Sequence, residues 1–468
     1  MSETETLFAA LRQSSDEAIV GMLERMVRHA PDHALNKINA VDLARTEGMD
    51  EDRVIATLLN AVGLGMFEMT WNVMCPSCAG VLSANKSLKT VNSAQYNCAF
   101  CAAGYETTLD NLVEVTFTVS PRVRKIAAHN PDELPAAEYY RQIFWSSAID
   151  LPADVEKLLD EVTLEIVDLP AGERAILSLQ APQGTLIVFD PVTHAAQFLD
   201  VSGEETSERQ NVSVIFNKLQ VPVDTATLRP GPLRLALDNR TDSRVLPAVW
   251  VANPALDDLL RRRKSVLTAT RLLTNQTFRD IYRTDTLAIG QRLKILSLTF
   301  LFSDLKDSTG LYERVGDLTA FDLVNEHFRL LQEIIASERG AIVKTIGDAV
   351  MATFETPDRA IAAAIRMREA MSDLGAERQH QSLRLKMGIH EGSCLAVTLN
   401  GQQDYFGQTV NIASRVQGLA ESRSIVVTES VVENARTRAL LKTSGIEPTP
   451  GRVELSGIAD KVSVYEIS

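Results

Sequence analysis

The first 72 residues have apolar positions at three- and four-residue spacing, as in LFAALRQSSDEAIVGMLERMV, and this spacing predicts amphipathic helices. A short helix, a turn at Glu47–Met49 and a second helix over about 50–62 are typical of a helix-turn-helix. The glycine-rich break at 63–65 and the apolar run over 66–73 then predict a strand. Residues 1–72 are therefore predicted to form a winged-helix-like module.

The pattern changes to period two between residues 161 and 252. Segments such as GTLIVFD, NVSVIFNKL and PLRLALDN predict about seven short strands separated by Gly, Pro and Asp turns, which favours a β-sandwich-like module. Residues 111–160 are expected to be a linker with helices. Residues 253–295 return to helical periodicity and predict a helical connector, whose leucines could pair with a second copy of the chain.

Residues 296–468 read as strand, helix, strand hairpin, helix and strand, which is the βαββαβ order of a ferredoxin-like domain. Pro357 and Gly375 mark the ends of the second helix. The chain as a whole is thus predicted to be an α+β multidomain protein. The strand-rich part over 161–252 contains no recognisable catalytic constellation, so that part is expected to be a binding or packing module.

Composition and charge narrow the possible partners. The 468 residues carry a net charge of −14. Residues 1–70 hold six Lys/Arg and twelve Asp/Glu, so 6 − 12 = −6, and the candidate recognition helix begins with three acids at 50–52. This sign argues against DNA binding, because phosphates need a basic face. No apolar run approaches the ~18 residues of a membrane span. The acidic N-terminus lacks a secretory pattern, and a cytoplasmic location is expected.

Four of the five cysteines form two C-x-x-C pairs, Cys75/Cys78 and Cys98/Cys101, with nineteen residues between the pairs. Two such pairs supply four thiolates, the set that tetrahedral zinc takes in zinc ribbons. A redox dithiol or an iron site are the alternatives. Residues 73–110 are therefore predicted to form a zinc ribbon, in which Zn²⁺ has a structural role.

Two acids are expected on neighbouring strands of the C-terminal domain. Asp304 ends the strand SLTFLFSDL, and Asp348 lies at the hairpin turn of VKTIGDAV. Two adjacent carboxylates repel each other unless a cation lies between them, and Mg²⁺ prefers carboxylates together with phosphate oxygens. The loop after Asp304 leads into a helix, so its backbone N–H groups could bind phosphate. The loop residues proposed to contact substrate are Leu305, Lys306, Ser308 and Thr309.

Three motifs, FSDLKDST, VKTIGDAV and DYFGQTVNIASR, resemble the catalytic motifs of class III nucleotidyl cyclases. The resemblance covers about residues 296–468. It implies that Asp304 and Asp348 hold two Mg²⁺ or Mn²⁺ ions per active site. It also implies that Lys344 and Asp404 select adenine. By the same resemblance, Asn411 orients the ribose and Arg415 stabilises the transition state.

The resemblance further implies a homodimer with active sites at the subunit interface. The metal-binding aspartates would come from one subunit, and the lysine, asparagine and arginine from the other. The predicted function is an adenylate cyclase that converts ATP to 3′,5′-cyclic AMP and pyrophosphate, regulated at its N-terminal region by an unknown ligand or protein. The alternative is a nucleotide-binding adaptor or transcriptional regulator whose cyclase-like domain is catalytically silent.

Overall fold

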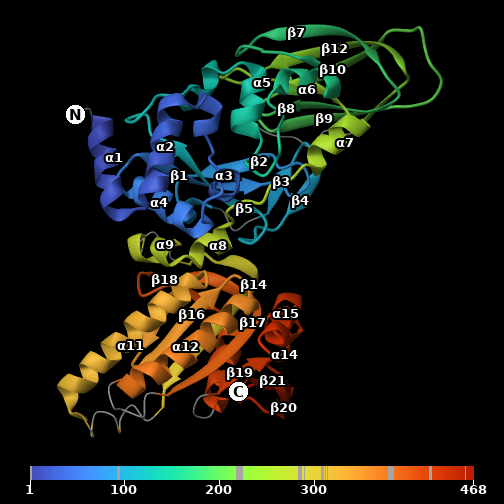
Figure 1. The fold of residues 1–468 in the computed structure, drawn as a ribbon. Helices are drawn as coiled ribbons and strands as arrows, with labels where there is room; N and C mark the ends of the chain where they lie inside the picture. The colour runs from blue at the N-terminus through green and yellow to red at the C-terminus, as the bar shows by residue number, and fades with distance from the viewer. Residues whose placement is uncertain are drawn as a thin grey trace. The chain divides into compact units, whose positions relative to one another are not determined.

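The computed structural model divides the chain into two compact units (Figure 1). The first unit comprises Met1–Ser87, Ala94–Thr107 and Leu112–Leu267, and the second comprises Leu88–Ser93, Thr108–Asn111 and Thr268–Ser468. The structure describes residues 3–91, 95–217, 225–282, 287–288, 290–306, 310, 313, 315–377, 384–420, 424–458 and 460–467, with the side chains of 375–377 left out. No helix among these residues is long and apolar enough to cross a membrane.

Four helices open the first unit: α1 (Glu3–Ser14), α2 (Glu17–His29), α3 (Ala40–Glu47) and α4 (Glu51–Gly63). Asp16, Asn39 and Asp50 cap the last three through side-chain oxygens that accept backbone N–H groups. Gly48 ends α3 in the left-handed conformation, with φ of 65°, and so allows the tight turn into α4. The helix-turn-helix order expected from the sequence is present, followed by the strand β1 (Phe67–Met74).

The strand β1 is the centre of a three-stranded antiparallel sheet rather than an isolated wing. It pairs with β2 (Val81–Asn85) and β5 (Val113–Val119). A separate hairpin, β3 (Tyr96–Cys98) with β4 (Ala103–Tyr105), carries the second cysteine pair. Short helices follow: α5 (Ala136–Tyr139), a π-helix (Tyr140–Phe144) and α6 (Val155–Val162).

Two sheets enclose one apolar core between residues 163 and 251. One sheet has the order β10-β12-β7 and the other β11-β9-β8-β13-β6. The bounds are β6 (Thr163–Ile166), β7 (Arg174–Ala181), β8 (Gly184–Asp190), β9 (Ala195–Val201), β10 (Gln210–Phe216), β11 (Ala226–Leu228), β12 (Gly231–Asn239) and β13 (Ala248–Val251). Leu199 of one sheet and Leu235 of the other are fully buried in this shared core.

The predicted connector consists of three short helices. These are α7 (Pro254–Arg261), α8 (Ala269–Leu273) and α9 (Gln276–Ile281). Side-chain oxygens of Asn253, Thr268 and Asn275 cap them, so each cap starts a new helix. The helix α7 belongs to the first unit, whereas α8 and α9 belong to the second.

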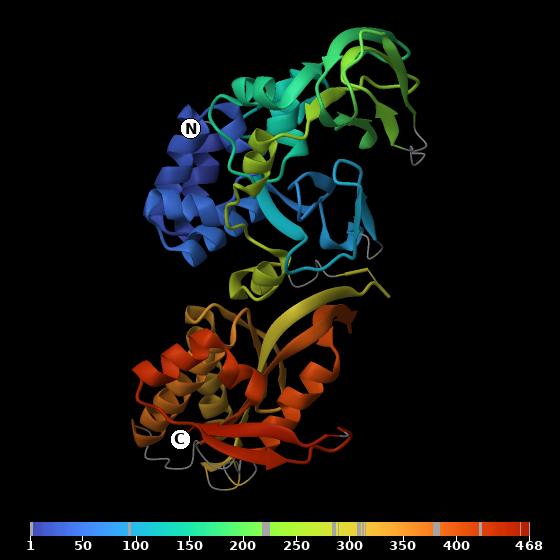
Figure 2. The ribbon, with the colours of Figure 1, turned by 90° about the vertical axis from the view of Figure 1, so that its right-hand side faces the viewer.

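The second unit is built on a twisted sheet of the order β15-β16-β14-β17-β19-β21-β20, with β18 paired to β17. Its first four strands have the 2-3-1-4 order of a ferredoxin-like βαββαβ fold. The bounds are β14 (Leu293–Leu305), β15 (Gly340–Ile346), β16 (Ala349–Phe354), β17 (Leu385–Leu399), β18 (Gln402–Phe406), β19 (Ile425–Thr428), β20 (Thr449–Val453) and β21 (Val462–Ile467). Figure 2 shows β20 and β21 side by side in red.

Helices cover both faces of this sheet. The large core joins residues of α11 (Asp317–Ser337), α12 (Pro357–Glu377), α14 (Glu429–Glu433) and α15 (Ala435–Thr443) to the sheet. A second, smaller core contains Val416 of α13 (Gln408–Leu419). Along β19, Val427 points into the first core and Val426 into the second, so α13 lies on the opposite face.

Candidate active site and metal centre

The two predicted metal-binding acids lie at adjacent ends of neighbouring strands. Asp304 is the last residue but one of β14, and Asp348 stands in the two-residue turn between β15 and β16. The antiparallel register pairs Ser303 with Val350, which sets the end of β14 beside this turn. Gly347, with φ of 63°, supplies the left-handed residue that the turn requires.

Electrostatics at this pair favour a bound cation. Burial raises the pKa of Asp304, and the neighbouring charge of Asp348 raises it further, whereas Lys386 acts in the opposite direction. The Oδ2 atom of Asp348 is buried and has no hydrogen-bond partner among the described residues. A buried acceptor with no donor, beside a second carboxylate, fits a divalent cation such as Mg²⁺ or Mn²⁺.

His327 of α11 is a neighbour of this site that the sequence analysis missed. It is fully buried, its Nδ1 lies 3.4 Å from the sulfur of Met371, and burial lowers its pKa to about 4. The charge of Asp348 acts in the opposite direction, which places the histidine near the carboxylates. At neutral pH His327 is therefore an uncharged packing group beneath the site, and nothing in its helical pattern distinguishes it from other core residues.

Lys344 and Asp404 form an ion pair across the second unit. The Nζ atom of Lys344, on β15, lies 2.5 Å from Oδ2 of Asp404, on β18. The lysine side chain is 40% exposed, whereas that of Asp404 is only 9% exposed. The other carboxylate oxygen of Asp404 accepts the backbone N–H of Tyr405 at 2.8 Å. A partly exposed donor, Lys344, and a fixed acceptor, Asp404, are therefore in contact, although they are sixty residues apart in the sequence.

Asn411 and Arg415 lie one turn apart on α13, so their side chains share one face of that helix. The helix sits very close to β17: a Cβ atom on Gly388 would lie 2.1 Å from the backbone nitrogen of Gln417. Only glycine permits this approach, which fixes the height of α13 over the sheet. The Arg415 guanidinium lies beside Gly457.

The loop after Asp304 is only partly described. Leu305 is buried in the large core, and Lys306 is exposed. The backbone N–H of Lys306 donates to the carbonyl of Arg384 at 2.9 Å. This N–H is therefore already hydrogen-bonded and is not free to bind a phosphate. Ser308 and Thr309, the other two predicted phosphate contacts, lie outside the described residues.

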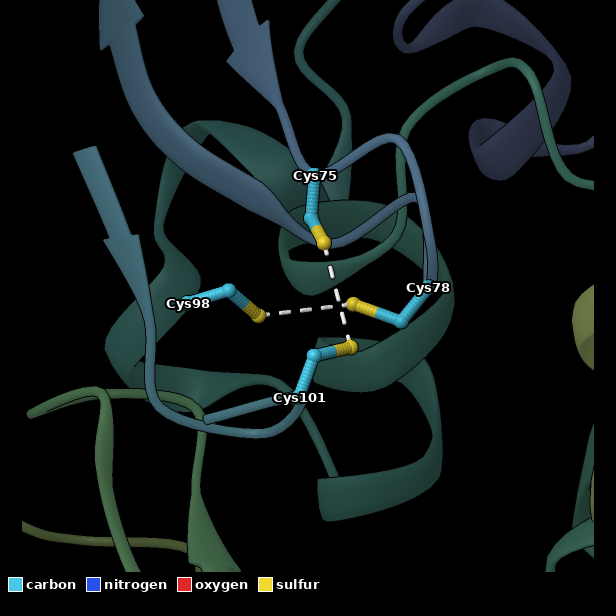
Figure 3. Close-up of side chains that lie close together, drawn as sticks. All are labelled: Cys75, Cys78, Cys98 and Cys101. Atoms are coloured by element: carbon cyan, nitrogen blue, oxygen red, sulfur yellow. Dashed lines mark hydrogen bonds between the residues drawn. The ribbon is translucent and has the colours of Figure 1, made fainter. Parts of the chain in front are cut away.

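The four paired cysteines converge in the first unit (Figure 3). The Sγ atoms of Cys75 and Cys101 are 3.8 Å apart, those of Cys78 and Cys98 are 3.6 Å apart, and all four lie within 4.8 Å of one another. None forms a disulfide. Tetrahedral zinc with Zn–S bonds of ~2.3 Å requires sulfurs ~3.8 Å apart. The cluster could therefore hold a metal ion.

An aromatic core surrounds this cluster and connects it to the strands β8 and β13. Phe100, between Cys98 and Cys101, packs edge-on against Phe189 and Trp250, with ring centroids 5.2 and 5.3 Å away. The backbone N–H of Gly80 points at the sulfur of Cys78, 3.4 Å away. Arg263, from the basic run 261–264, donates to the carbonyl of Ser77 at 2.5 Å. The site is therefore embedded in the core of the first unit and is not an isolated knuckle.

Comparison with known families gives two matches. Residues 293–468 match the adenylate and guanylate cyclase catalytic domain, and residues 1–280 match a family of unknown function (DUF5939). The C-terminal part is thus a class III adenylate/guanylate cyclase catalytic domain, which confirms the resemblance found in the motifs. Since the other match spans more than half of the chain, this chain belongs to the DUF5939 family.

Bacterial adenylate cyclases are among the related proteins. The adenylate cyclase of Anabaena cylindrica is 30% identical over 185 residues, which cover 36% of this chain and 36% of the relative. Adenylate cyclase 2 of Rhizobium meliloti is 26% identical over 183 residues, with 36% and 49% covered. The chain thus spans less than half the length of either relative.

Solved cyclase structures also align with this chain. The adenylyl cyclase CyaB from P. aeruginosa has 24% sequence identity and a TM-score of 0.34, covering 38% of this chain and 96% of that chain. The guanylyl cyclase Cya2 has 20% identity and a TM-score of 0.34, covering 38% and 94%. Both solved chains align over most of their own length.

Proposed function

We propose that the chain is an adenylate cyclase, which converts ATP to 3′,5′-cyclic AMP and pyrophosphate. The observation that carries the proposal is the carboxylate pair at the end of β14, where Asp348 keeps a buried oxygen without a partner among the described residues. This pair stands in a domain that matches the cyclase family. Asp304 and Asp348 would hold two Mg²⁺ or Mn²⁺ ions, which lower the pKa of the ribose 3′-hydroxyl and neutralise the triphosphate.

Two residues of α13 would assist this reaction, Arg415 through its charge and Asn411 through its position. Negative charge grows on the phosphoryl oxygens as the 3′-hydroxyl attacks the α-phosphorus, and a guanidinium fixed at Arg415 can stabilise it. Asn411, one turn earlier on the same face, can orient the ribose by hydrogen bonds without adding charge. The close packing of α13 on Gly388 supports this role, because it fixes both side chains on one rigid element.

Lys344 and Asp404 would choose the base. Adenine presents an exocyclic amine, which can donate to Asp404, and a ring nitrogen, which can accept from Lys344. Guanine presents the reverse pattern at its six-position. The two side chains already contact each other, with 2.5 Å between Nζ and Oδ2, so a base entering here meets a donor and an acceptor held side by side.

Changing both members of the pair, Lys344→Glu with Asp404→Cys, should lower kcat/KM for ATP by about ten- to a hundred-fold, because the hydrogen bonds to adenine are lost. The ratio of GTP to ATP turnover should rise. Cyclic nucleotide formation from each substrate with Mn²⁺ measures this. The charge-preserving variant Lys442→Arg, on α15, is the control and should behave as wild type. Wild-type protein that uses GTP as well as ATP would refute the assignment of the pair.

We further propose that each active site needs two subunits, as the resemblance of the motifs to class III cyclases implies. One chain would supply the two aspartates, and its partner would supply the base-recognition pair Lys344/Asp404 and α13. The sites would then be equivalent across the two-fold axis of a homodimer.

Regulation by the N-terminal region is supported by the course of the chain, because two short segments within the sequence span of the first unit belong to the second unit. The second cysteine pair lies between Leu88–Ser93 and Thr108–Asn111, and both of these segments belong to the second unit. The backbone N–H of Leu109 donates to the carbonyl of Lys294 at 3.0 Å, and the N–H of Leu296 donates to Asp110 at 2.5 Å. Lys294 and Leu296 lie on β14, the strand that ends at Asp304. A change at the cysteine cluster would therefore reach β14 through a few covalently linked residues.

We also propose that the cysteine cluster binds zinc, which gives a direct prediction. Metal analysis of the full chain should find close to one zinc per chain, and Cys75→Ser should lose it and lower the melting temperature, because three thiolates, two of them buried, then lack their cation. Cys394→Ala removes the remaining cysteine and serves as the control that keeps the metal. Iron in place of zinc, or full zinc content in Cys75→Ser, would contradict the assignment.

A further inference from the structure

One arginine links the two strands that carry the base-recognition pair. Arg279, on α9, donates from Nε to the carbonyl of Ile342 at 3.1 Å and from Nη2 to the carbonyl of Val343 at 3.4 Å. The same Nη2 donates to the carbonyl of Gln403 at 3.0 Å. Val343 directly precedes Lys344, and Gln403 directly precedes Asp404. A single planar guanidinium therefore bridges the residues before both members of the pair.

The backbone of β15 explains why these carbonyls are open to a side chain. It is an edge strand of the sheet, and its register with β16 shifts between Ile342 and Lys344. An edge strand with a bulge leaves backbone groups outside the ladder, and these need other partners. The side chain of Gln276 accepts the N–H of Ile342 at 2.8 Å, so α9 satisfies both polar groups of that residue.

The surroundings of Arg279 hold its side chain in place. Its Nη1 donates to the carbonyl of Leu273 at 3.5 Å, and its guanidinium carbon lies 6.0 Å from the ring centroid of Tyr405, the residue after Asp404. A cleft of about 450 Å³ adjoins this arrangement, and its lining includes Arg279, Lys344 and Gln402. A base that contacted Lys344 in this cleft would lie close to Arg279, which lines the same cleft.

We propose that Arg279 is a positioning residue that sets the spacing between Lys344 and Asp404, and thereby the preference for adenine. The inference rests on the proposed function of that pair. Lysine cannot substitute, because one ammonium on a flexible stem lacks the rigid fork that reaches three carbonyls on two strands. The DUF5939 match ends at residue 280 and so covers α9 as far as Asp280, although α9 belongs to the second unit. A displacement of α9 would therefore alter the base site directly, which is a route for regulation by the N-terminal region.

Binding of unreactive substrate analogues tests this inference independently of turnover. Calorimetric titration of the full chain with α,β-methylene-ATP and α,β-methylene-GTP, in Mg²⁺, gives the affinity for each base. We expect Arg279→Met to weaken the adenine analogue about ten-fold and the guanine analogue much less, and Arg279→Lys to fall close to Arg279→Met. The control Arg329→Met, at an exposed salt bridge of α11, should match wild type.

The possible results of this titration distinguish failure of the positioning role of Arg279 from failure of the proposed cyclase activity. A purely structural role would lower the folded fraction, seen by circular dichroism, without changing the ratio of the two affinities in the remaining folded protein. Unchanged affinities in Arg279→Met, or an equal loss for both analogues, would overturn the positioning role. Wild-type protein that binds the adenine analogue but forms no cyclic AMP would refute the proposed activity. It would not contradict the role of Arg279 in positioning Lys344 and Asp404.

Discussion

Replacing Asp304 by asparagine is expected to lower cyclic AMP formation from ATP by about a hundred- to a thousand-fold, the scale seen when a group that stabilises transition-state charge is removed. The amide keeps the size of the side chain but cannot offer a negative charge to the metal ions. The rate of product formation with saturating Mn²⁺ measures the loss. Asp317→Asn, an exposed acid in the first turn of α11, is the matched control and should keep wild-type activity.

A binding measurement distinguishes metal loss from misfolding in this variant. Because burial and Asp348 raise the pKa of Asp304, removing that carboxyl also removes the repulsion between the two acids. Asp304→Asn should thus fold at least as stably as wild type in the absence of metal, while its apparent affinity for Mn²⁺ falls. A variant that is destabilised yet retains more than about a tenth of the activity would contradict the role of Asp304 as a metal ligand.

Mixing two inactive variants, Asp304→Ala and Arg415→Ala, is expected to restore activity. Each variant homodimer has two defective sites. In a mixed dimer both substitutions fall in the same site, and the other site is wild type. Random exchange of subunits makes half of the dimers mixed, so recovery should reach about a quarter of wild-type activity. Activity per molecule should also fall on dilution below the dimer dissociation constant.

The control for this experiment mixes Asp304→Ala with Asp348→Ala, both on the metal side of the site. Those two substitutions leave every site of a mixed dimer defective, so no recovery is expected. Failure of the first mixture to recover, when subunit exchange has been demonstrated with differently tagged chains, would contradict the two-subunit site. A single-chain nucleotide site would then be the better description.

Local patterns in the sequence anticipated the fold of the second unit well. Asp304 at a strand end and Asp348 beside a turn glycine follow from apolar runs and from turn chemistry, both of which act over a few residues. The predicted domain start at 296 was less accurate, since β14 begins at Leu293. Its first residues pair with β17, and that pairing depends on residues about a hundred positions later.

Long-range arrangements were not visible in the sequence. Thr108–Asn111 overlaps the end of the predicted zinc ribbon, yet it belongs to the second unit because its backbone bonds to β14. Arg279 looks like an ordinary polar position of a short amphipathic helix, and only the bulge in β15 reveals its role. The apolar spacing of residues 253–295 predicted a helical connector without showing its breaks. In the structure, Thr268 and Asn275 each cap a new helix and so interrupt the connector.

The identity of the product is the most direct test of adenylate cyclase activity in this protein. Purified protein comprising residues 1–468 should be incubated with ATP or with GTP in the presence of Mn²⁺, and the products separated by chromatography and identified by mass spectrometry. We expect cyclic AMP and pyrophosphate in equal amounts from ATP, with little cyclic GMP from GTP. Cyclic GMP as the main product would contradict the adenine assignment of Lys344 and Asp404. The absence of any cyclic nucleotide, from protein that binds Mn²⁺ and ATP, would contradict the cyclase itself and favour a silent nucleotide-binding domain.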